Sequence, residues 1–249
     1  MKTGFLITAR MKSTRLPSKL IQKLGTREII RHMIDRLKLA KDLEKIIVCT
    51  SANPQDGILK TIVEEEGVDC FLGSEEDVIA RLYNAARAFE LDYVINITAD
   101  CPLVAYEYIP VIINQYKEKK PDLIRCFDLP HGLYSYGMDV GAMGKVCEIK
   151  DSFNTEVWGR YFSDTGYFKV LDLEIPAKHQ RKYRLTLDYP EDLEVFKKIY
   201  EYFGKDTFRK TVDEIISYLD KYPQVAALNS GCADKFIKRY NEQDKIKLK

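Results

Sequence analysis

Arginine, lysine and hydroxyl side chains are concentrated in one segment near the start of the chain, residues 9–19, which reads Ala-Arg-Met-Lys-Ser-Thr-Arg-Leu-Pro-Ser-Lys. An arginine fork can pair with two phosphate oxygens at once, and a lysine supplies a mobile point charge. The segment directly follows the apolar run Phe5-Leu6-Ile7, which is typical of a buried strand. Because polyphosphates bind where such a strand ends and leads through a loop into a helix, the segment predicts a triphosphate site.

The charge of the chain is divided unevenly between this region and the rest. Residues 1–40 carry a net charge of +8 and the whole chain +1, so the other 209 residues carry −7. A local excess of positive charge focuses a field on one site, whereas binding to long nucleic acid calls for a basic balance over a whole domain. The distribution therefore favours a small anionic ligand over nucleic acid. A solvated basic loop that binds nothing is the alternative interpretation.

Length and composition bound the class of protein. A chain of 249 residues with 45% hydrophobic content can bury one substantial core, and we expect a single domain over 1–249. No apolar stretch has the length of a membrane span and the first residues lack a signal-peptide pattern, so we expect a soluble cytoplasmic protein with no membrane partner. The six cysteines form no Cys-x-x-Cys pair, which predicts reduced, packed thiols.

The hydrophobic pattern alternates between strands and helices. The buried apolar runs 4–9, 45–50 and 93–98 predict parallel strands, and their order with the intervening helical patterns predicts an α/β fold with right-handed crossovers. The other expected strands are 68–72, 122–126, 166–174 and 183–187, and the expected helices are 27–40, 54–66, 76–89, 106–119 and 190–203. Residues 127–144 hold four glycines, which predicts turns and a pocket wall.

Two aspartates follow expected strands and could complete a phosphate site. Asp100 comes after 93–98 and Asp188 after 183–187. Triphosphate chemistry requires a divalent cation, and Mg²⁺ is usually held by one or two carboxylates with phosphate oxygens and water. We therefore expect Mg²⁺ at Asp100 and Asp188. Each aspartate also fits an ordinary turn or helix cap.

Four segments, in this order, carry a family resemblance: the basic segment 9–19, Gly-Ser-Glu-Glu-Asp-Val at 73–78, Thr-Ala-Asp-Cys-Pro-Leu at 98–103, and Asp-Tyr-Pro-Glu-Asp-Leu at 188–193. Together they resemble the cytidylyltransferases that activate acidic sugars, including the 3-deoxy-manno-octulosonate and acylneuraminate enzymes, and are most similar to the branch of the spore-coat polysaccharide protein SpsF. The resemblance implies a Rossmann-like three-layer nucleotidyltransferase fold with a mostly parallel central sheet. It also implies a small dimerisation arm at about 126–182, and the charged tail suggests a peripheral helix at about 230–249.

The activity that the resemblance implies is Mg²⁺-dependent transfer of CMP from CTP to an anionic sugar, with release of pyrophosphate, for surface glycan biosynthesis by a homodimer. Catalytic roles would fall to Arg10, Lys19 and Asp100, and the metal to Asp100 and Asp188. The residues implied to bind the nucleotide are Ala9, Arg10, Ser13, Arg15, Lys19, Thr50, Ser51, Asp77, Val78, Arg81 and Thr98.

The acceptor pocket is less well defined, because the chain departs from the best-known members. Thr186 stands where acylneuraminate enzymes tend to carry an aspartate, Gly141 where the SpsF branch has a glutamate, and Cys101 where octulosonate enzymes have a glutamate. Cations and histidines suit a carboxylate or phosphate on the acceptor, although His131 also fits an ordinary loop. The candidates are Arg125, His131, Tyr134, Tyr136, Asp139, Lys178, His179 and Arg184.

Two other functions remain open at this stage. A sugar-phosphate or polyol-phosphate nucleotidyltransferase would keep the fold, but such enzymes usually open with a glycine-rich loop and Thr8-Ala9-Arg10 has none. A noncatalytic nucleotide-binding subunit is suggested by Gly141. CTP binding without turnover would favour the subunit over both enzymes. The helical spacing of Trp158, Tyr161 and Phe162 predicts that these side chains lie in the core or at a subunit contact.

Overall fold

The computed structural model describes residues 1–242 and 246–249. Its centre is a seven-stranded sheet in the order β5-β4-β1-β6-β8-β7-β9, and a separate two-stranded hairpin pairs β2 with β3. In the sheet β8 runs antiparallel to β6 and β7, and the other pairings are parallel. The strands are β1 Thr3–Thr8, β2 Lys23–Leu24, β3 Arg27–Glu28, β4 Lys45–Ser51, β5 Asp69–Gly73, β6 Tyr93–Thr98, β7 Leu123–Arg125, β8 Tyr136–Asp139 and β9 Val170–Asp172.

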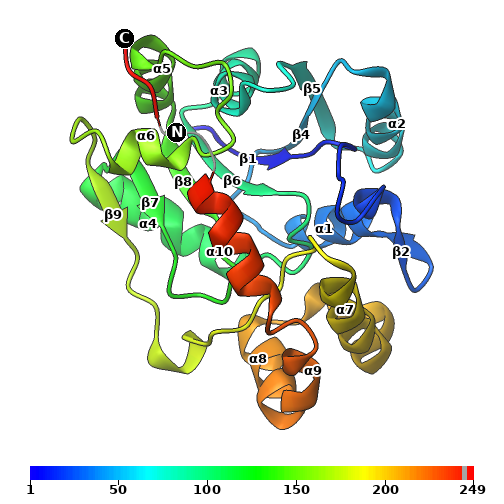
Figure 1. Ribbon diagram of the computed structural model, residues 1–249. Coiled ribbons are helices and arrows are strands. Elements are labelled where there is room, and N and C mark those ends of the chain that lie inside the picture. The colour runs from blue at the N-terminus through cyan, green and yellow to red at the C-terminus, as the bar shows by residue number, and fades with distance from the viewer. Residues whose placement is uncertain (243–245) are drawn as a thin grey trace.

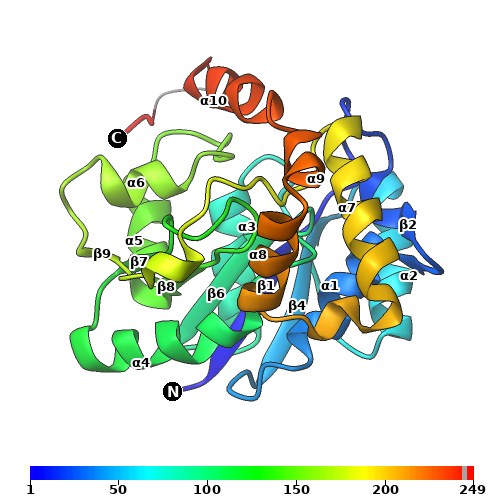
Figure 2. The ribbon, with the colours of Figure 1, turned by 90° about the horizontal axis from the view of Figure 1, so that it is seen from below.

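Helices cover both faces of this sheet (Figures 1 and 2). The α-helices are α1 Ile29–Leu37, α2 Gly57–Glu65, α3 Val78–Ala88, α4 Ile109–Lys119, α5 Val140–Ile149, α6 Gly159–Ser163, α7 Pro190–Phe203, α8 Val212–Lys221, α9 Pro223–Ala227 and α10 Cys232–Glu242. Single 3₁₀ turns lie at Lys19–Ile21, Pro54–Asp56, Tyr106–Tyr108 and Ala177–His179, and a longer one at Gly204–Arg209.

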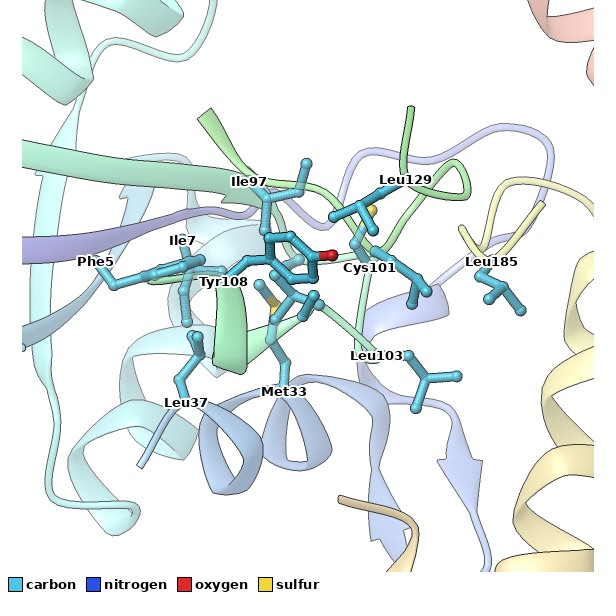
Figure 3. Packing of buried hydrophobic residues seen from close by; sticks show 14 of the residues in the cluster. Phe5, Ile7, Met33, Leu37, Ile97, Cys101, Leu103, Tyr108, Leu129 and Leu185 are labelled. Atoms are coloured by element: carbon cyan, nitrogen blue, oxygen red, sulfur yellow. The ribbon is translucent and has the colours of Figure 1, made fainter. Parts of the chain in front are cut away.

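The alternation of side chains along β1 divides the core into two layers. Phe5 and Ile7 belong to a cluster with α1, α2, α4, α7 and α8, and Leu6 belongs to a second cluster with α3, α5 and α6. Figure 3 shows the first cluster, in which Met33 and Leu37 of α1 lie beside Phe5 and Ile7. Because successive side chains of a strand point to opposite faces, one buried strand anchors helices on both sides.

Most of the predicted elements are present. The strands expected at 4–9, 45–50, 68–72, 93–98 and 122–126 are β1, β4, β5, β6 and β7, and the helix expected at 190–203 is α7. The expected strand 166–174 is limited to the three residues of β9. The six cysteines are free, as expected. No helix in the described ranges is long and apolar enough to cross a membrane.

The prediction of a strand at 183–187 is wrong. Arg184 makes a single bridge to His131, outside the sheet, and the Leu187 amide donates to the Asp100 carbonyl at 2.9 Å. The segment therefore pairs with loops at the carboxyl edge of the sheet instead of extending the sheet. Its apolar side chains are buried by that edge, which produces a strand-like pattern without a strand.

The prediction of irregular structure for 127–144 is also partly wrong, because β8 and the first half of α5 lie in this range. Gly137 weakens the strand pattern, yet it is required in β8: a Cβ at this position would overlap the Tyr93 hydroxyl and Ile112. Two strands of the expected arm at 126–182, β8 and β9, lie in the central sheet. The helix expected at 230–249 is α10 as far as Glu242, and 243–245 lie outside the described residues.

Candidate active site

A cavity of about 430 Å³ opens at the carboxyl ends of β1 and β6, the edge of a parallel sheet where ligands bind. The basic segment 9–19 forms one part of its wall, and residues from six other parts of the chain complete it. The lining residues include Arg10, Lys12, Ser13, Arg15, Lys19, Val78, Thr98, Asp100, His131, Tyr134, Tyr136, Glu156, Trp158, Asp188, Phe236, Arg239 and Tyr240.

Lys19 lies between the two aspartates that the sequence singles out. Its Nζ donates to Asp100 Oδ2 at 2.5 Å and to Asp188 Oδ1 at 3.1 Å. Burial disfavours the ammonium, but Asp100 and Asp188 raise the pKa of Lys19. Burial likewise disfavours the Asp188 carboxylate, but Lys19 and Arg184 lower the pKa of Asp188. Two carboxylates thus converge on one cation at the base of the cavity.

The start of α7 fixes the position of Asp188. Arg184 donates from Nη2 to Asp188 at 2.7 Å and from Nε to Asp192 at 3.0 Å. The Asp192 carboxylate in turn accepts the backbone amides of Asp188 and Tyr189, each at 2.9 Å. Arg184 is therefore enclosed between two carboxylates behind the cavity and is not among its lining residues. It orients Asp188.

The other cations of the basic segment also face acidic side chains. Arg10 donates to Glu156 at 2.5 Å, Lys12 pairs with Glu75 and Glu76, and Arg15 donates to Asp188 at 2.9 Å. Each contact holds a cation at the cavity wall with its charge balanced. A triphosphate that enters would offer the same cations several anionic oxygens at once, in place of separate carboxylates.

The residues expected to read the base lie behind the cavity wall, with the exception of Val78, which lines it. Asp77 caps α3 through the Ala80 amide and accepts the Thr155 hydroxyl and Lys150. The Ser51 hydroxyl donates to Asp56 at 2.6 Å. Ala9 is buried, and its amide donates to the Cys49 carbonyl.

Arg81 and Thr50 differ from these neighbours in hydrogen bonding. Arg81 Nη1 donates to the carbonyls of Ser74 and Glu75. Within the described structure, Arg81 Nε and Nη2 and the Thr50 hydroxyl are buried without a hydrogen-bond partner. Burial, with a smaller contribution from Arg10, lowers the pKa of Arg81. Unpartnered buried donors are rare and call for an acceptor.

Aromatic side chains form a second part of the cavity wall. His131, Tyr134, Tyr136 and Trp158 line it. The turn before Tyr134 depends on Gly132, whose φ of 99° lies in the left-handed region and whose missing Cβ leaves room for the Leu185 carbonyl. Burial, together with the Arg184 charge, lowers the pKa of His131, so its ring is neutral near pH 7.

The remaining acceptor candidates lie elsewhere. Arg125 donates two hydrogen bonds to the Asp172 carboxylate, each at 2.7 Å. Arg125 lines an adjoining hollow of about 420 Å³. Asp139 caps α5 and accepts the Tyr116 hydroxyl. Lys178 and His179 both contact Asp213 of α8. None of the four lines the first cavity.

The cavity residues that sequence reasoning did not single out include Glu156, Phe236, Arg239 and Tyr240. Three of these lie on α10, where an apolar stripe at the helical spacing 232, 236 and 240 was the available signal. Glu156 follows a loop and carries no pattern that identifies it.

Comparison with known proteins identifies the family. A family model described as cytidylyltransferase matches residues 5–238. The chain belongs to the cytidylyltransferase family. A solved cytidylyltransferase of Leptospira borgpetersenii serovar Hardjo-bovis, 28% identical, covers 91% of this chain and 97% of its own, with a TM-score of 0.82. The expected three-layer nucleotidyltransferase fold is confirmed.

Two relatives of this cytidylyltransferase carry informative names. The spore coat polysaccharide biosynthesis protein SpsF of Bacillus subtilis is 27% identical over 230 residues, 89% of this chain and 95% of its own. The 8-amino-3,8-dideoxy-manno-octulosonate cytidylyltransferase of Shewanella sp. is 28% identical over 240 residues, 93% and 87% of the two chains. The expected resemblance to acidic-sugar cytidylyltransferases, including the SpsF branch, is confirmed, and the protein is a nucleotidyltransferase.

Proposed function

We propose that this cytidylyltransferase transfers CMP from CTP to an oxygen of an anionic sugar in surface glycan biosynthesis. The observation that carries the proposal is the convergence of Asp100 and Asp188 on Lys19 beside the basic segment. In the reaction, an acceptor oxygen bonds to the α-phosphorus while the bond from that phosphorus to the bridging oxygen of the β-phosphate breaks. The acceptor hydroxyl loses its proton, and pyrophosphate leaves with the bridging oxygen.

The two carboxylates suit Mg²⁺, because they are hard oxygen ligands already brought within hydrogen-bond reach of one cation. No cluster of three or more His, Cys, Asp or Glu residues in the described ranges is arranged for a metal, so phosphate oxygens and water would supply the other ligands. Mg²⁺ held by Asp100 and Asp188 would supply positive charge to the triphosphate. Arg10, Arg15 and Lys19 then donate to phosphate oxygens, and Ser13 offers a hydroxyl. Positioning and charge stabilisation are what nucleotidyl transfer requires of a protein.

The unpartnered donors of Arg81 and Thr50 support the proposed base site. Cytosine presents two acceptors, O2 and N3, on its pairing edge, and a buried guanidinium with two unpartnered donor nitrogens, Nε and Nη2, is a chemically matched reader. Val78 lines the cavity beside this region. We expect the base to lie against Val78 with its acceptors directed toward Arg81.

The names of the relatives support an anionic sugar as the acceptor. The experiment is pyrophosphate release with Mg²⁺ and each ribonucleoside triphosphate, against sugar acids, sugar phosphates and polyol phosphates. We expect release with CTP and a sugar acid, and loss of that release in Asp100→Ala but not in Asp42→Ala, an exposed aspartate outside the cavity. Release only with a sugar phosphate or polyol phosphate would mean that the acceptor belongs to that class and is not a sugar acid. Full activity of Asp100→Ala would reject the metal and phosphate site.

The proposal also includes a homodimer in the cytoplasm. Phe153 and Tyr167, within the range 126–182, are exposed aromatics, at 83% and 58%, and exposed aromatic side chains are common at subunit contacts. Light scattering should give twice the chain mass, and Phe153→Ser should lower that mass. A monomeric mass for the unmodified protein would reject the dimer without affecting the proposed reaction.

A further inference from the structure

The C-terminal helix α10 forms part of the cavity. In Figures 1 and 2 it lies across the carboxyl edge of the sheet, apart from the helix layers. Its residues Phe236, Arg239 and Tyr240 line the cavity. The Phe236 ring lies 4.9 Å from the His131 ring, between ring centres, and α10 is tied to the start of α7 by a 3.1 Å ion pair between Lys235 and Glu191. A helix expected to be peripheral thus closes one side of the site.

The helix adds a cation to the aromatic part of the wall. Among the described lining residues five are Lys or Arg, and four of them, Arg10, Lys12, Arg15 and Lys19, belong to the basic segment. The fifth is Arg239. Its neighbour Tyr240 also lines the adjoining hollow with Tyr136, which places this part of α10 on the aromatic side. Arg239 is exposed to the solvent of the cavity mouth.

The other arginines near the aromatic wall are committed to carboxylates of the protein. Arg184 is buried in pairs with Asp188 and Asp192. Arg125 pairs with Asp172 in the adjoining hollow. An acidic acceptor that lies against Trp158 and Tyr240 would therefore meet a positive charge supplied by α10. That charge would also offset repulsion between the acceptor and the triphosphate, since both substrates are anions.

We propose that Arg239 pairs with the carboxylate of the acceptor sugar and that the rings of Trp158 and Tyr240 pack against the sugar, so that α10 determines acceptor specificity. This inference rests on the proposed cytidylyl transfer to an anionic sugar. The planar guanidinium can donate two parallel hydrogen bonds to a carboxylate. Arg239 is a binding residue in this account and takes no part in the bond changes at phosphorus.

The test compares Arg239→Ala and Arg239→Lys with Lys238→Ala, a matched control on the same helix that lies outside the cavity lining. The acceptor is 3-deoxy-manno-octulosonate or whichever sugar acid the unmodified enzyme uses best. We expect Arg239→Ala to raise the KM for the acid on the order of tenfold or more, with an unchanged KM for CTP. Arg239→Lys should recover part of the loss. The control should match the unmodified enzyme.

A neutral analogue of the same acid, its carboxamide, isolates the charge. The unmodified enzyme should prefer the acid, and Arg239→Ala should lose most of that preference because its KM for the carboxamide changes little. Equal KM values for the acid in Arg239→Ala and Lys238→Ala would overturn the inference while leaving the proposed reaction intact.

Failure of the proposed reaction would be seen separately, as the absence of pyrophosphate release by the unmodified protein. In that case binding is measured directly. Trp158, the one tryptophan of the chain, lines the cavity and reports occupancy by its fluorescence. Titration with 3-deoxy-manno-octulosonate should give a Kd that rises on the order of tenfold in Arg239→Ala and is unchanged in Lys238→Ala. No change in Arg239→Ala, or no binding by the unmodified protein, would overturn the inference.

Discussion

The two parts of the cavity wall are built differently. The phosphate side is one continuous segment after β1 together with Asp100 and Asp188, and its cations are held in ion pairs with carboxylates. The aromatic side is assembled from residues between 131 and 240, on loops, at the first residue of β8 and on α10. The first side holds a fixed charge pattern, which in the proposed function serves the triphosphate of CTP. The second side presents rings from loops, from the first residue of β8 and from α10, and of these elements α10 lies apart from the sheet and its helix layers (Figures 1 and 2).

The largest effect on activity is expected when the cation between the two carboxylates is removed. Lys19→Met should lower kcat on the order of 10²- to 10³-fold, because a positioned charge at the reacting phosphates is lost, with little change in the KM for the acceptor. Pyrophosphate release measures both. Lys23→Met, an exposed lysine on β2, is the control. A variant of Lys19 with normal kcat would show that the phosphate side is only a structural ion cluster.

A second prediction concerns the stability of the phosphate side. Asp188→Asn leaves Arg15, Lys19 and Arg184 without a shared carboxylate, so the free energy of unfolding at pH 7 should fall by about 3 kcal/mol. The folded-state pKa of Asp188 is lowered, so its stabilisation is present above the ordinary carboxyl pKa of about 4 and is lost as the pH falls below it.

Urea unfolding at several pH values checks this. The difference between Asp188→Asn and the unmodified protein should be largest at neutral pH and should narrow below about pH 4, where the unmodified protein also loses the contribution of its carboxylate. Asp42→Asn, on the exposed surface, should behave as the unmodified protein. A difference that is constant with pH would mean that Asp188 stabilises the fold through packing and not through charge.

Substitutions on the aromatic side should have a smaller effect, and that effect should fall on the KM for the acceptor and not on the KM for CTP. Tyr240→Ala removes one ring of the wall, and the KM for the acceptor should rise by about fivefold, the order expected for one ring contact, with the KM for CTP unchanged. Ile237→Ala on the same helix, an exposed residue outside the cavity lining, is the control. A larger effect on CTP than on the acceptor would reverse the assignment of the two sides.

The smallest effect is expected at the rim of the phosphate side. Lys12 is exposed and pairs with Glu75 and Glu76, and exposed pairs contribute little to stability. Lys12→Ala should leave the Tm unchanged and raise the KM for CTP by about two- to threefold. That rise should shrink at high salt because exposed charges are screened. An effect as large as that of Lys19→Met would remove the distinction between rim and base.

The same contrast explains what could be predicted from sequence. The basic segment is contiguous and follows a strand, and the strand β6 leads directly to Asp100, so their approach follows from parallel-sheet geometry. Asp188 lies at this edge as its sequence position predicts, but the strand expected before it is absent. Its position depends on Arg184, Asp192 and backbone bonds to neighbouring loops.

The aromatic side could be predicted only in part. Tyr134 and Tyr136 lie in a glycine-rich region that indicated a pocket wall, and they line the cavity. Arg239 is more than a hundred residues away along the chain, and helical periodicity gives the face of α10 but not what that face covers. Trp158 is buried in a core cluster, which is one of its two expected roles, and it also lines the cavity, which its spacing does not predict.

The most direct test of the account is a crystal structure of the protein with CTP and Mg²⁺. The account predicts the triphosphate within hydrogen-bond distance of Arg10, Arg15 and Lys19, with the metal on Asp100 and Asp188. It also predicts that the space between Trp158 and Arg239 stays open for the acceptor. A triphosphate bound against the aromatic side, or a basic segment that keeps its carboxylate partners when CTP is bound, would contradict the account.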